Sequence, residues 1–488
     1  MLLVLSLIGC VAPPEYVECD GPKVCQETFG IASTCLDDGF CGTWELPARC
    51  PTTTPSDLLT VDPQPKLGET IVIATLMDAS EDAFEQQAAM LPLIELAESD
   101  SGPGNIPVAA IHCTYEESDD FDSLSREDAA IELAAFLAVD VQPPAIVGPN
   151  SSAIANVVFN QFQAAGFTPL MVSPSATSSE LTVIDGPSSD KSDENPGLFW
   201  RTASPDDGQA RSIANDIFGE LALTKVAVIN ESGAYGEGLA QSFKSEFEGL
   251  GGTATLYNFD GSGALAAQVA TVAELDDTEA PAVLFISSQI SEARSFVQIA
   301  AADSTGSFDA KILFFTDGAA DSRLIEFDLA AGDVDPTRLF PNIRGTRPVL
   351  PTGAVYNSFN NLYRAEFGGD ASDSAWTAHA YDATWLAIYG IDWAAANEAS
   401  VGPIEAARGL RQISEGDQTT VGVFGFADVQ ASFATATSVD LVGASGTLDY
   451  DSFTEETSAP VELWSVNTTG DGFDAIGQCA PNGVCTYP

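Results

Sequence analysis

The chain has 488 residues, 45% of them hydrophobic and 9% aromatic, which is enough to build the buried cores of two or three ordinary domains. Its 71 acidic and 18 basic residues give a formal net charge of −53. This charge excludes nucleic acid and anionic lipid headgroups as partners, because both would be repelled. The acidity favours either attraction of cationic or zwitterionic ligands or simply a heavily solvated surface.

The first ten residues, MLLVLSLIGC, form an apolar run that ends Leu7-Ile8-Gly9-Cys10. This run resembles the lipobox of bacterial lipoprotein signal peptides, in which cleavage leaves the cysteine as an acylated N-terminus. The resemblance implies a lipid anchor at Cys10. No Lys or Arg precedes Cys10, so either the true start lies upstream or the match is accidental. No other apolar stretch approaches the roughly 18 residues that a membrane helix needs.

Residues 11–50 hold five cysteines among Gly, Asp and Pro, and they are too few to bury a core of their own. This composition predicts a small disulfide-stapled module in an oxidising compartment. Five is an odd number, so one module cysteine must pair elsewhere or stay free. Cys479 and Cys485, in the C-terminal tail 479–488, are close enough to join each other, which leaves Cys113 as its candidate partner. Zinc is the rival interpretation, but the chain has two histidines and no Cys-x-x-Cys spacing. Residues 51–69, rich in Pro and Thr, are predicted as an extended tether.

From Thr70 onward, β-branched or apolar runs alternate with segments of helical periodicity. Strands are expected at 70–76, 107–112, 145–147, 169–172, 226–230, 255–259, 282–287 and 312–316, and helices at 84–96, 129–139, 239–250, 265–275 and 292–302. This alternation is typical of doubly wound parallel sheets, and its fresh start after Ala203 predicts two Rossmann-like α/β lobes. Neither lobe carries the glycine-rich phosphate loop of nucleotide-binding proteins, so no cofactor is expected.

Hydroxyl side chains follow two neighbouring strands of the first lobe, in the segments GPNSS (148–152) and SPSAT (173–177). Ligands of an open parallel sheet lie beyond the carboxyl ends of its strands, where backbone N–H groups and helix N-termini favour an anionic group. The two segments therefore predict a cradle for a carboxylate, made by Ser151, Ser152, Ser175, Ala176 and Thr177. The alternative is that these hydroxyls only cap the helices that follow them.

These two segments, with Glu180-Leu181-Thr182 behind the second, resemble the solute-binding proteins of branched-chain amino-acid ABC transporters, which are type I periplasmic binding proteins. A second block, KVAVIN (225–230) followed by YGEGLA (235–240), resembles the opening strand and helix of the second lobe in that family. The resemblance covers roughly residues 70 to 467.

The resemblance implies two α/β lobes joined by a three-segment hinge, with chain crossings near Ala203, Gly345 and Asp449. The first lobe would then comprise residues 70–203 and 346–449, and the second lobe residues 204–345 and 450–478. The segment 375–393 would be a long helix returned to the first lobe.

The resemblance also implies roles for individual residues. Asp317 follows a strand where the family has an acid that pairs with the ammonium of the ligand, and Tyr235 matches a tyrosine beside the cleft. Ser175 and Thr177 fall where the family contacts the α-groups of the ligand. Asp317 could instead be a helix N-cap, and Tyr235 could simply pack at a strand–helix corner.

The sequence departs from the family pattern at two places. Met77-Asp78-Ala79-Ser80 stands where the family usually has a Ser-Gly turn near the ligand. Ser288-Gln289-Ile290 stands where the family often has an aromatic residue, so Gln289 is predicted to line a pocket more polar than one built for leucine.

Enzymatic chemistry is not indicated. Glu237 and Asp317 could be paired carboxylates, but the sequence signals neither a nucleophile nor a scissile bond between them. His379, among Trp376, Tyr381 and Trp385, is predicted as a core or boundary histidine, and His112 joins no Ser-His-Asp order.

The sequence therefore predicts an extracytoplasmic, lipid-anchored solute-binding protein of the periplasm or cell surface. Its two lobes would close by a hinge on an amino acid or similar small polar solute for delivery to an ABC permease. The same fold could instead serve as a sensor that reports to a membrane receptor, or as a surface adhesion lipoprotein whose cleft has lost binding.

Overall fold

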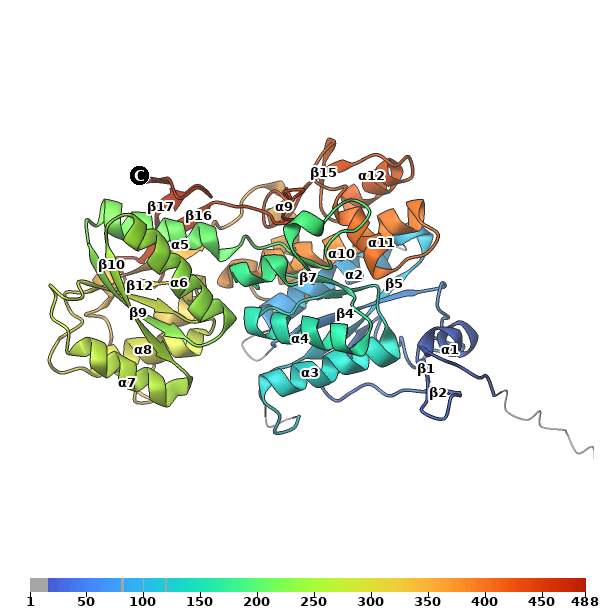
Figure 1. The fold of residues 1–488 in the computed structure, drawn as a ribbon, viewed down its shortest axis with the longest axis horizontal. Coiled ribbons are helices and arrows are strands. Elements are labelled where there is room, and N and C mark those ends of the chain that lie inside the picture. Colours follow the sequence, from blue (N-terminus) through green and yellow to red (C-terminus); the bar gives the residue numbers. More distant parts are fainter. Residues whose placement is uncertain (1–15, 80–82, 100, 119–120) are drawn as a thin grey trace, which may run out of the picture.

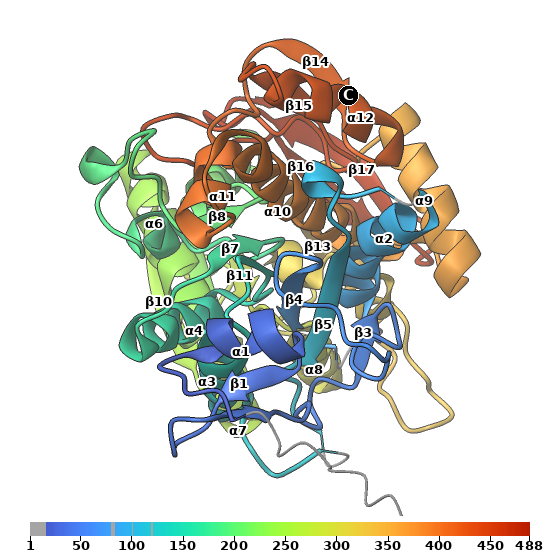
Figure 2. The ribbon, with the colours of Figure 1, turned by 90° about the vertical axis from the view of Figure 1, so that its right-hand side faces the viewer.

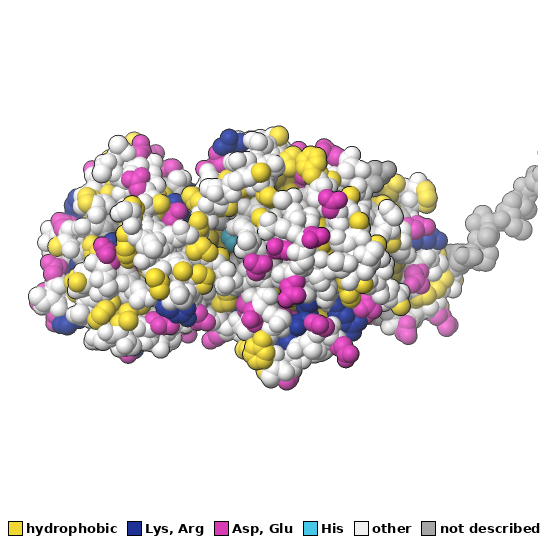
Figure 3. All heavy atoms as spheres, turned by 90° about the horizontal axis from the view of Figure 1, so that it is seen from above, with side chains coloured by type: hydrophobic (Ala, Val, Ile, Leu, Met, Phe, Trp, Pro, Cys, Tyr) yellow, Lys and Arg dark blue, Asp and Glu magenta, His cyan; other side chains and the backbone are white. Residues whose placement is uncertain are grey.

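The structure is a computed structural model that describes residues 16–79, 83–99, 101–118 and 121–488 of the chain. Two α/β lobes lie side by side along the longest axis, and the Cys-rich module lies at the outer end of the first lobe (Figure 1). Cys10, the predicted acylation site, lies outside the described residues. Within them, no helix combines the length and the apolar character that crossing a membrane requires. Acidic side chains are spread over both lobes, and basic ones are few (Figure 3).

The first lobe is built on a six-stranded sheet with the order β3-β5-β4-β6-β7-β8. Its strands are β3 (Thr52–Thr54), β4 (Ile71–Met77), β5 (Val108–Thr114), β6 (Ala145–Val147), β7 (Leu170–Ser173) and β8 (Phe199–Arg201). All neighbours are parallel except β3, which runs antiparallel to β5. The carboxyl ends of the parallel strands therefore meet at one edge of the sheet, where the predicted cradle segments follow β6 and β7.

Helices cover both faces of this sheet, which explains why its strands are apolar throughout. Along β4, Ile73 and Met77 face one core and Ala74 and Leu76 face the other. The first core is completed by α2 (Phe84–Ser99), α9 (Ala354–Phe367), α10 (Thr377–Asn397), α11 (Pro403–Leu410) and α12 (Val423–Phe433), and the second by α3 (Arg126–Phe136) and α4 (Ser152–Ala165). Helices α10, α11 and α12 lie on the side of the sheet opposite α3 and α4 (Figure 2).

Helix α10 is the long helix that the sequence resemblance assigned to residues 375–393, and it lies in the core of the first lobe. Trp385 and Tyr389 on it are fully buried. Its close approach to α11 depends on two glycines, because a Cβ atom at Gly390 would lie 2.5 Å from the Ala406 carbonyl oxygen and one at Gly409 would lie 2.7 Å from that of Gly390. Two short strands, β14 (Asp417–Thr420) and β15 (Val439–Val442), form a parallel pair beside it.

The second lobe is built on an eight-stranded sheet with the order β10-β9-β11-β12-β13-β16-β17-β18. Its strands are β9 (Lys225–Glu231), β10 (Thr253–Phe259), β11 (Ala282–Ile286), β12 (Ile312–Phe315), β13 (Ile343–Pro348), β16 (Val461–Val466), β17 (Phe473–Cys479) and β18 (Cys485–Thr486). The pairs from β10 to β13 are parallel and those from β13 to β18 antiparallel. Helices α7 (Gly261–Ala273) and α8 (Ile290–Ala302) pack on one face, and α5 (Asp206–Asn215) and α6 (Ala234–Gly249) on the other. The two predicted α/β lobes are thus confirmed.

The chain passes between the lobes three times, from β8 to α5, from β13 to α9, and from the end of the first lobe to β16. The first crossing is anchored by Arg201, whose side chain is fully buried and donates to both carboxylate oxygens of Glu456 at 2.6 and 2.7 Å. Its main-chain oxygen accepts a hydrogen bond from the Tyr450 hydroxyl at 2.9 Å. The first and third crossings are therefore bound to each other.

His379 lies beneath the first crossing and is 6% exposed. Its Nδ1 lies 3.1 Å from the main-chain oxygen of Thr202, and the Thr202 hydroxyl donates to the main-chain oxygen of His379. Burial lowers the pKa of His379 to about 4, so the ring is neutral at physiological pH. The structure places this histidine in the core, as the sequence analysis expected.

The Cys-rich module contains α1 (Pro22–Phe29), β1 (Ser33–Cys35) and β2 (Cys41–Thr43). Disulfides Cys19–Cys35 and Cys25–Cys41 staple it. The fifth module cysteine pairs across to the first lobe as Cys50–Cys113, which confirms the predicted partner. The module also packs on this lobe, since the rings of Trp44 and Phe136 lie 5.3 Å apart in an edge-to-face contact.

Residues 51–69, predicted as an extended tether, are instead packed on the first lobe. Thr52–Thr54 forms the edge strand β3, and the Thr54 hydroxyl lies 2.9 Å from Nε2 of the buried His112 on β5. Leu58 is also buried, in a small cluster with Ile31 and Ala109. The cause is the Cys50–Cys113 bond, because it holds the start of this segment against β5 and leaves strand pairing as the favourable state.

The tail 479–488 is likewise part of the second lobe. Cys479 ends β17, the disulfide Cys479–Cys485 turns the chain back, and β18 pairs with β17. The Tyr487 hydroxyl donates to the Asp216 carboxylate at 2.9 Å. The segment 52–54 and the C-terminal tail therefore each add an antiparallel edge strand to the sheet of a lobe.

The disulfides give a first test of this arrangement. Cys50–Cys113 closes a sequence separation of 63 residues and Cys479–Cys485 one of only 6. Because cross-links stabilise mainly by restricting the unfolded chain, replacing Cys50 and Cys113 by Ala should lower the free energy of unfolding by about 4 kcal/mol, against about 2 kcal/mol for the same change at Cys479 and Cys485. Denaturant unfolding followed by circular dichroism would measure both, and equal losses would contradict the expectation.

Candidate ligand-binding cleft

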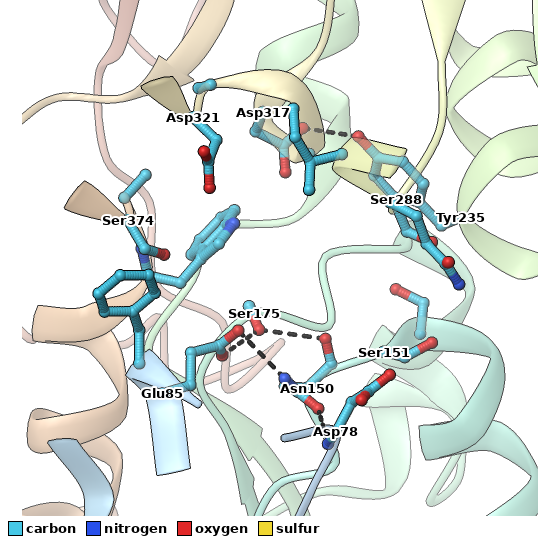
Figure 4. Close-up of a pocket in the computed structure, with 18 of the residues that line it drawn as sticks. Asp78, Glu85, Asn150, Ser151, Ser175, Tyr235, Ser288, Asp317, Asp321 and Ser374 are labelled. Atoms are coloured by element: carbon cyan, nitrogen blue, oxygen red, sulfur yellow. Dashed lines mark hydrogen bonds between the residues drawn. The ribbon is translucent and has the colours of Figure 1, made fainter. Parts of the chain in front are cut away.

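A pocket opens between the two lobes, at the carboxyl ends of the parallel strands of both sheets. Its first-lobe wall includes Asp78, Glu85, Asn150, Ser151 and Ser175. Its second-lobe wall includes Tyr235, Ser288, Gln289, Asp317 and Asp321. Figure 4 shows these walls facing each other across open space, with most of the polar atoms turned inward.

Six of the eight predicted ligand-binding residues line this pocket: Ser151, Ser152, Ser175, Tyr235, Gln289 and Asp317. The other two, Ala176 and Thr177, do not. Ala176 is fully buried in the core beside α4, and Thr177 is 4% exposed and accepts a main-chain hydrogen bond from Asp206. After Ser175 the chain turns away from the cleft, so these two residues lie behind its wall.

The loop between β6 and α4 forms part of the first-lobe wall of the pocket. Gly148 has a φ of +107°, and a Cβ atom there would lie 2.2 Å from the Leu76 carbonyl oxygen, so glycine allows the loop to lie directly against the end of β4. Helix α4 then begins at Ser152 with Ser151 as its N-cap, and the Ser151 hydroxyl makes no capping hydrogen bond. The alternative of pure helix capping is therefore wrong for Ser151, whose hydroxyl lies in the pocket.

Glu85, which the sequence analysis missed, occupies the predicted carboxylate cradle. It lies in the first turn of α2, and its two carboxylate oxygens accept hydrogen bonds from Ser175 Oγ at 2.6 Å and from Asn150 Nδ2 at 3.1 Å. Burial raises the pKa of Glu85 to about 7, against the lowering effect of these two donors. Ser175 was expected to donate to a carboxylate of the ligand, and the structure shows that it donates to Glu85.

On the opposite wall, Asp317 is 8% exposed and begins a short 3-10 helix, Asp317–Ala319, whose N-cap is Thr316. Asp317 is therefore not an N-cap. Its Oδ1 accepts hydrogen bonds from Tyr235 Oη at 2.7 Å and from Gln209 Nε2 at 2.6 Å. The other carboxylate oxygen of Asp317 points toward the open space of the pocket (Figure 4).

A second buried acid, Asp206, lies behind Asp317. Asp206 is 2% exposed, and neither of its carboxylate oxygens has a hydrogen-bond partner among the described residues. Burial first, and then the negative charge of Asp317, raises the pKa of Asp206 well above its usual range. This side of the pocket thus has a strong excess of acceptor groups.

Two ion pairs flank the pocket, and the sequence analysis missed both. Arg126 on α3 lies 2.5 Å from the Asp78 carboxylate in the first lobe, and Arg323 lies 2.6 Å from the Asp321 carboxylate in the second. Asp78 stands where the sequence departs from the family pattern. Each guanidinium is thus held by an aspartate of its own lobe.

Behind Ser288 and Gln289 lies a small carboxyl cluster. The Ser287 hydroxyl is 3.1 Å from Glu231 and 2.6 Å from Glu292, and the Ser288 hydroxyl donates to Glu231 at 3.2 Å. Burial, followed by the charge of Glu292, raises the pKa of Glu231 to about 7.

This raised pKa predicts a pH-dependent stability. The folded state binds more protons than the unfolded state between about pH 4.5 and 7, so Glu231 stabilises the fold less as pH rises through that window. Glu231→Gln should therefore be more stable than the wild type by about 1 to 3 kcal/mol at pH 8, with little difference near pH 5. Thermal unfolding at both pH values would measure this. Glu237→Gln, an exposed change on α6, is the control and should behave like the wild type at both.

Two lobes of doubly wound α/β structure, three chain crossings and a polar cleft between the lobes define a type I periplasmic binding protein. Residues 105–469, well over half of the chain, match the family model ANF_receptor, described as the receptor family ligand binding region. The chain belongs to this family.

Solved structures of the same fold include the leucine-binding protein LivK from Thermotoga maritima, with a TM-score of 0.61 and 17% identity over 85% of this chain and 100% of that one. The branched-chain amino-acid transporter substrate-binding protein LivJ from Streptococcus pneumoniae, in complex with isoleucine, has a TM-score of 0.59 and 17% identity over 86% and 100%. An ABC-transporter solute-binding protein from R. palustris, in complex with 4-hydroxybenzoate, has a TM-score of 0.61 and 16% identity over 84% and 97%. These likenesses establish the fold.

Among curated proteins, the Leu/Ile/Val-binding protein BraC3 from Rhizobium johnstonii is 35% identical over 102 residues. The match covers 20% of this chain and 24% of that protein, so it spans about a quarter of the relative.

Proposed function

We propose that the protein binds a small polar solute with an ammonium group between its two lobes and releases it unchanged for uptake by an ABC permease. The observation that carries the proposal is Asp317, a buried carboxylate with one oxygen held by Tyr235 and Gln209 and the other turned toward the cleft. A cationic group of the solute would pair with that second oxygen. No bond in the solute needs to be broken, so the activity is binding and release.

The position of the cleft supports closure on the solute. Its two walls belong to different lobes, which the chain connects through three crossing segments, and such lobes move by small changes at those segments. They already touch beside the cleft, where the Ser178 hydroxyl donates to the Ala234 main-chain oxygen at 2.9 Å and the Ser179 hydroxyl to Asp207 at 2.9 Å. Contacts of the solute with both walls would exist only in the closed state and would favour it.

A carboxylate on the solute, if present, would lie at the N-terminus of α4. The Ser151 hydroxyl lies in the pocket there, and the first N–H groups of a 14-residue helix favour negative charge. Ser151 would thus take the role that the sequence analysis shared among four hydroxyls.

The proposed location is extracytoplasmic, with the chain tethered to a membrane by acylated Cys10. Four disulfides among the described residues support an oxidising compartment. A sensor that signals through a membrane receptor is the second candidate, since the Cys-rich module is docked rigidly on the first lobe and offers a surface beyond the two lobes. Co-purification of the protein with a receptor instead of a permease would favour the sensor.

The proposal predicts that Asp317→Asn weakens binding. A thermal-shift screen with L-leucine, L-glutamine, L-lysine, putrescine and benzoate would identify a stabilising solute, since a ligand of the folded state raises the unfolding midpoint. Calorimetry with that solute should then show a loss of about 2 to 5 kcal/mol in Asp317→Asn, because the cation would meet an uncharged amide. Asp260→Asn, an exposed change on the same lobe, should bind as the wild type does. Equal affinity of Asp317→Asn and the wild type would overturn the assignment.

A further inference from the structure

The pocket presents one acceptor carboxylate on each wall. Glu85 on the first lobe and Asp317 on the second face each other across the open space (Figure 4). They come from the first turn of α2 and from the loop after β12, at the carboxyl ends of the first and second sheets.

Neither carboxylate forms an ion pair with any lysine or arginine in the described part of the chain. The two guanidiniums that line the pocket, those of Arg126 and Arg323, lie against Asp78 and Asp321. The hydrogen bonds that Glu85 and Asp317 accept come from neutral groups, namely Ser175, Asn150, Tyr235 and Gln209. As far as the described residues show, the pocket therefore holds two acids without a cationic partner.

This charge balance matters when the lobes close, because closure removes water from both acids. A buried carboxylate that gains no cation loses its hydration without compensation. A solute with one ammonium group satisfies Asp317 and leaves Glu85 facing either an apolar group or the carboxylate of the solute. A carboxylate at Ser175 would be worse still, since the Ser175 hydroxyl already donates to Glu85.

We infer that the solute carries two cationic nitrogen groups, one bound by Asp317 and the other by Glu85; this rests on the proposed function. The class comprises diamino acids such as lysine and the diamines obtained from them by loss of the carboxyl group. Where the solute has a carboxylate, the Ser151 hydroxyl and the N–H groups at the start of α4 would donate hydrogen bonds to it. Phe84, Ile290 and Trp376 also line the pocket and offer apolar and aromatic surface for the methylene chain between the two nitrogens.

The first arm of the test compares solutes on the full-length wild-type protein by calorimetry. L-lysine and L-norleucine have the same chain length and differ in the terminal ammonium group, and cadaverine lacks the carboxylate of lysine. The inference expects lysine, cadaverine or both to bind roughly ten- to a hundredfold tighter than norleucine. Preference for lysine over cadaverine would indicate a diamino acid, and the reverse a diamine.

The second arm uses Glu85→Gln, which keeps the size of the side chain and removes its charge. The one amide oxygen of glutamine can take over one of the two hydrogen bonds that Ser175 and Asn150 donate to Glu85. Affinity for the preferred dication should fall roughly ten- to a hundredfold, while affinity for norleucine should stay the same or rise, because the variant no longer buries an uncompensated charge beside the norleucine side chain. Asp260→Asn serves again as the charge-matched control. The unfolding midpoint of each variant without solute would show that it is folded.

The outcomes separate the inference from the proposed function. If norleucine binds the wild type as tightly as lysine and cadaverine do, or if Glu85→Gln leaves dication binding unchanged, the inference fails and the proposed function stands. If only solutes without an ammonium group bind, or if Asp317→Asn binds every amine as the wild type does, the proposed function fails as well. The solute comparison does not depend on any variant, so it decides even if Glu85→Gln does not fold.

Discussion

A buried guanidinium holds together the parts of this molecule on which binding depends. Arg201 is fully buried, and besides its double contact with Glu456 it donates to the main-chain oxygens of Ala176 and Ser178 at 2.9 and 2.8 Å. One side chain thus joins the first crossing, the third crossing and the loop that carries Ser175. Burying such a charge is expensive, and a saturated set of acceptors is what offsets the cost. The contacts of Arg201 fix the position of the Ser175 loop, which is part of the cleft wall, relative to the crossing segments about which the lobes would move.

The chemistry of the cleft follows from where the walls place their acids. In the first lobe, Ser175 and Asn150 could have donated hydrogen bonds to a carboxylate of the solute. They donate to Glu85 instead, so a carboxylate of the protein occupies that position. In the second lobe Tyr235 and Gln209 orient Asp317 from one side only. The proteins with the same fold whose structures contain isoleucine or 4-hydroxybenzoate show that the scaffold does not dictate the solute. The cleft of this chain combines a polar lining with two acids, Glu85 and Asp317, that form no ion pair with a lysine or arginine among the described residues.

Two disulfides lie next to the edge strands β3 and β18 of the two lobe sheets. Cys50–Cys113 holds β3 and the Cys-rich module on the first lobe, and Cys479–Cys485 returns β18 to the second. Both sheets thereby gain an antiparallel edge that covers strands which would otherwise offer unpaired main-chain groups. The module is consequently attached to the first lobe by a disulfide and by packing contacts.

The sequence by itself determined the two lobes and the apolar parallel strands and helices at their centres, because burial on both faces of a sheet and on one face of a helix imposes patterns that are local in the chain. Counting cysteines indicated that Cys113 pairs with a cysteine of the N-terminal module, and strand ends together with the family resemblance marked six residues of the cleft. Only the tertiary structure decided the role of Glu85, whose partners Asn150 and Ser175 are 65 and 90 residues away, and of Arg201, whose partner Glu456 is 255 residues away. It also decided that β3 and β18 are strands, since such short polar segments carry no periodicity and pair only when a distant cross-link holds them in place. Contacts between residues far apart in the sequence depend on how the elements pack in three dimensions, so a local pattern of side chains cannot predict them.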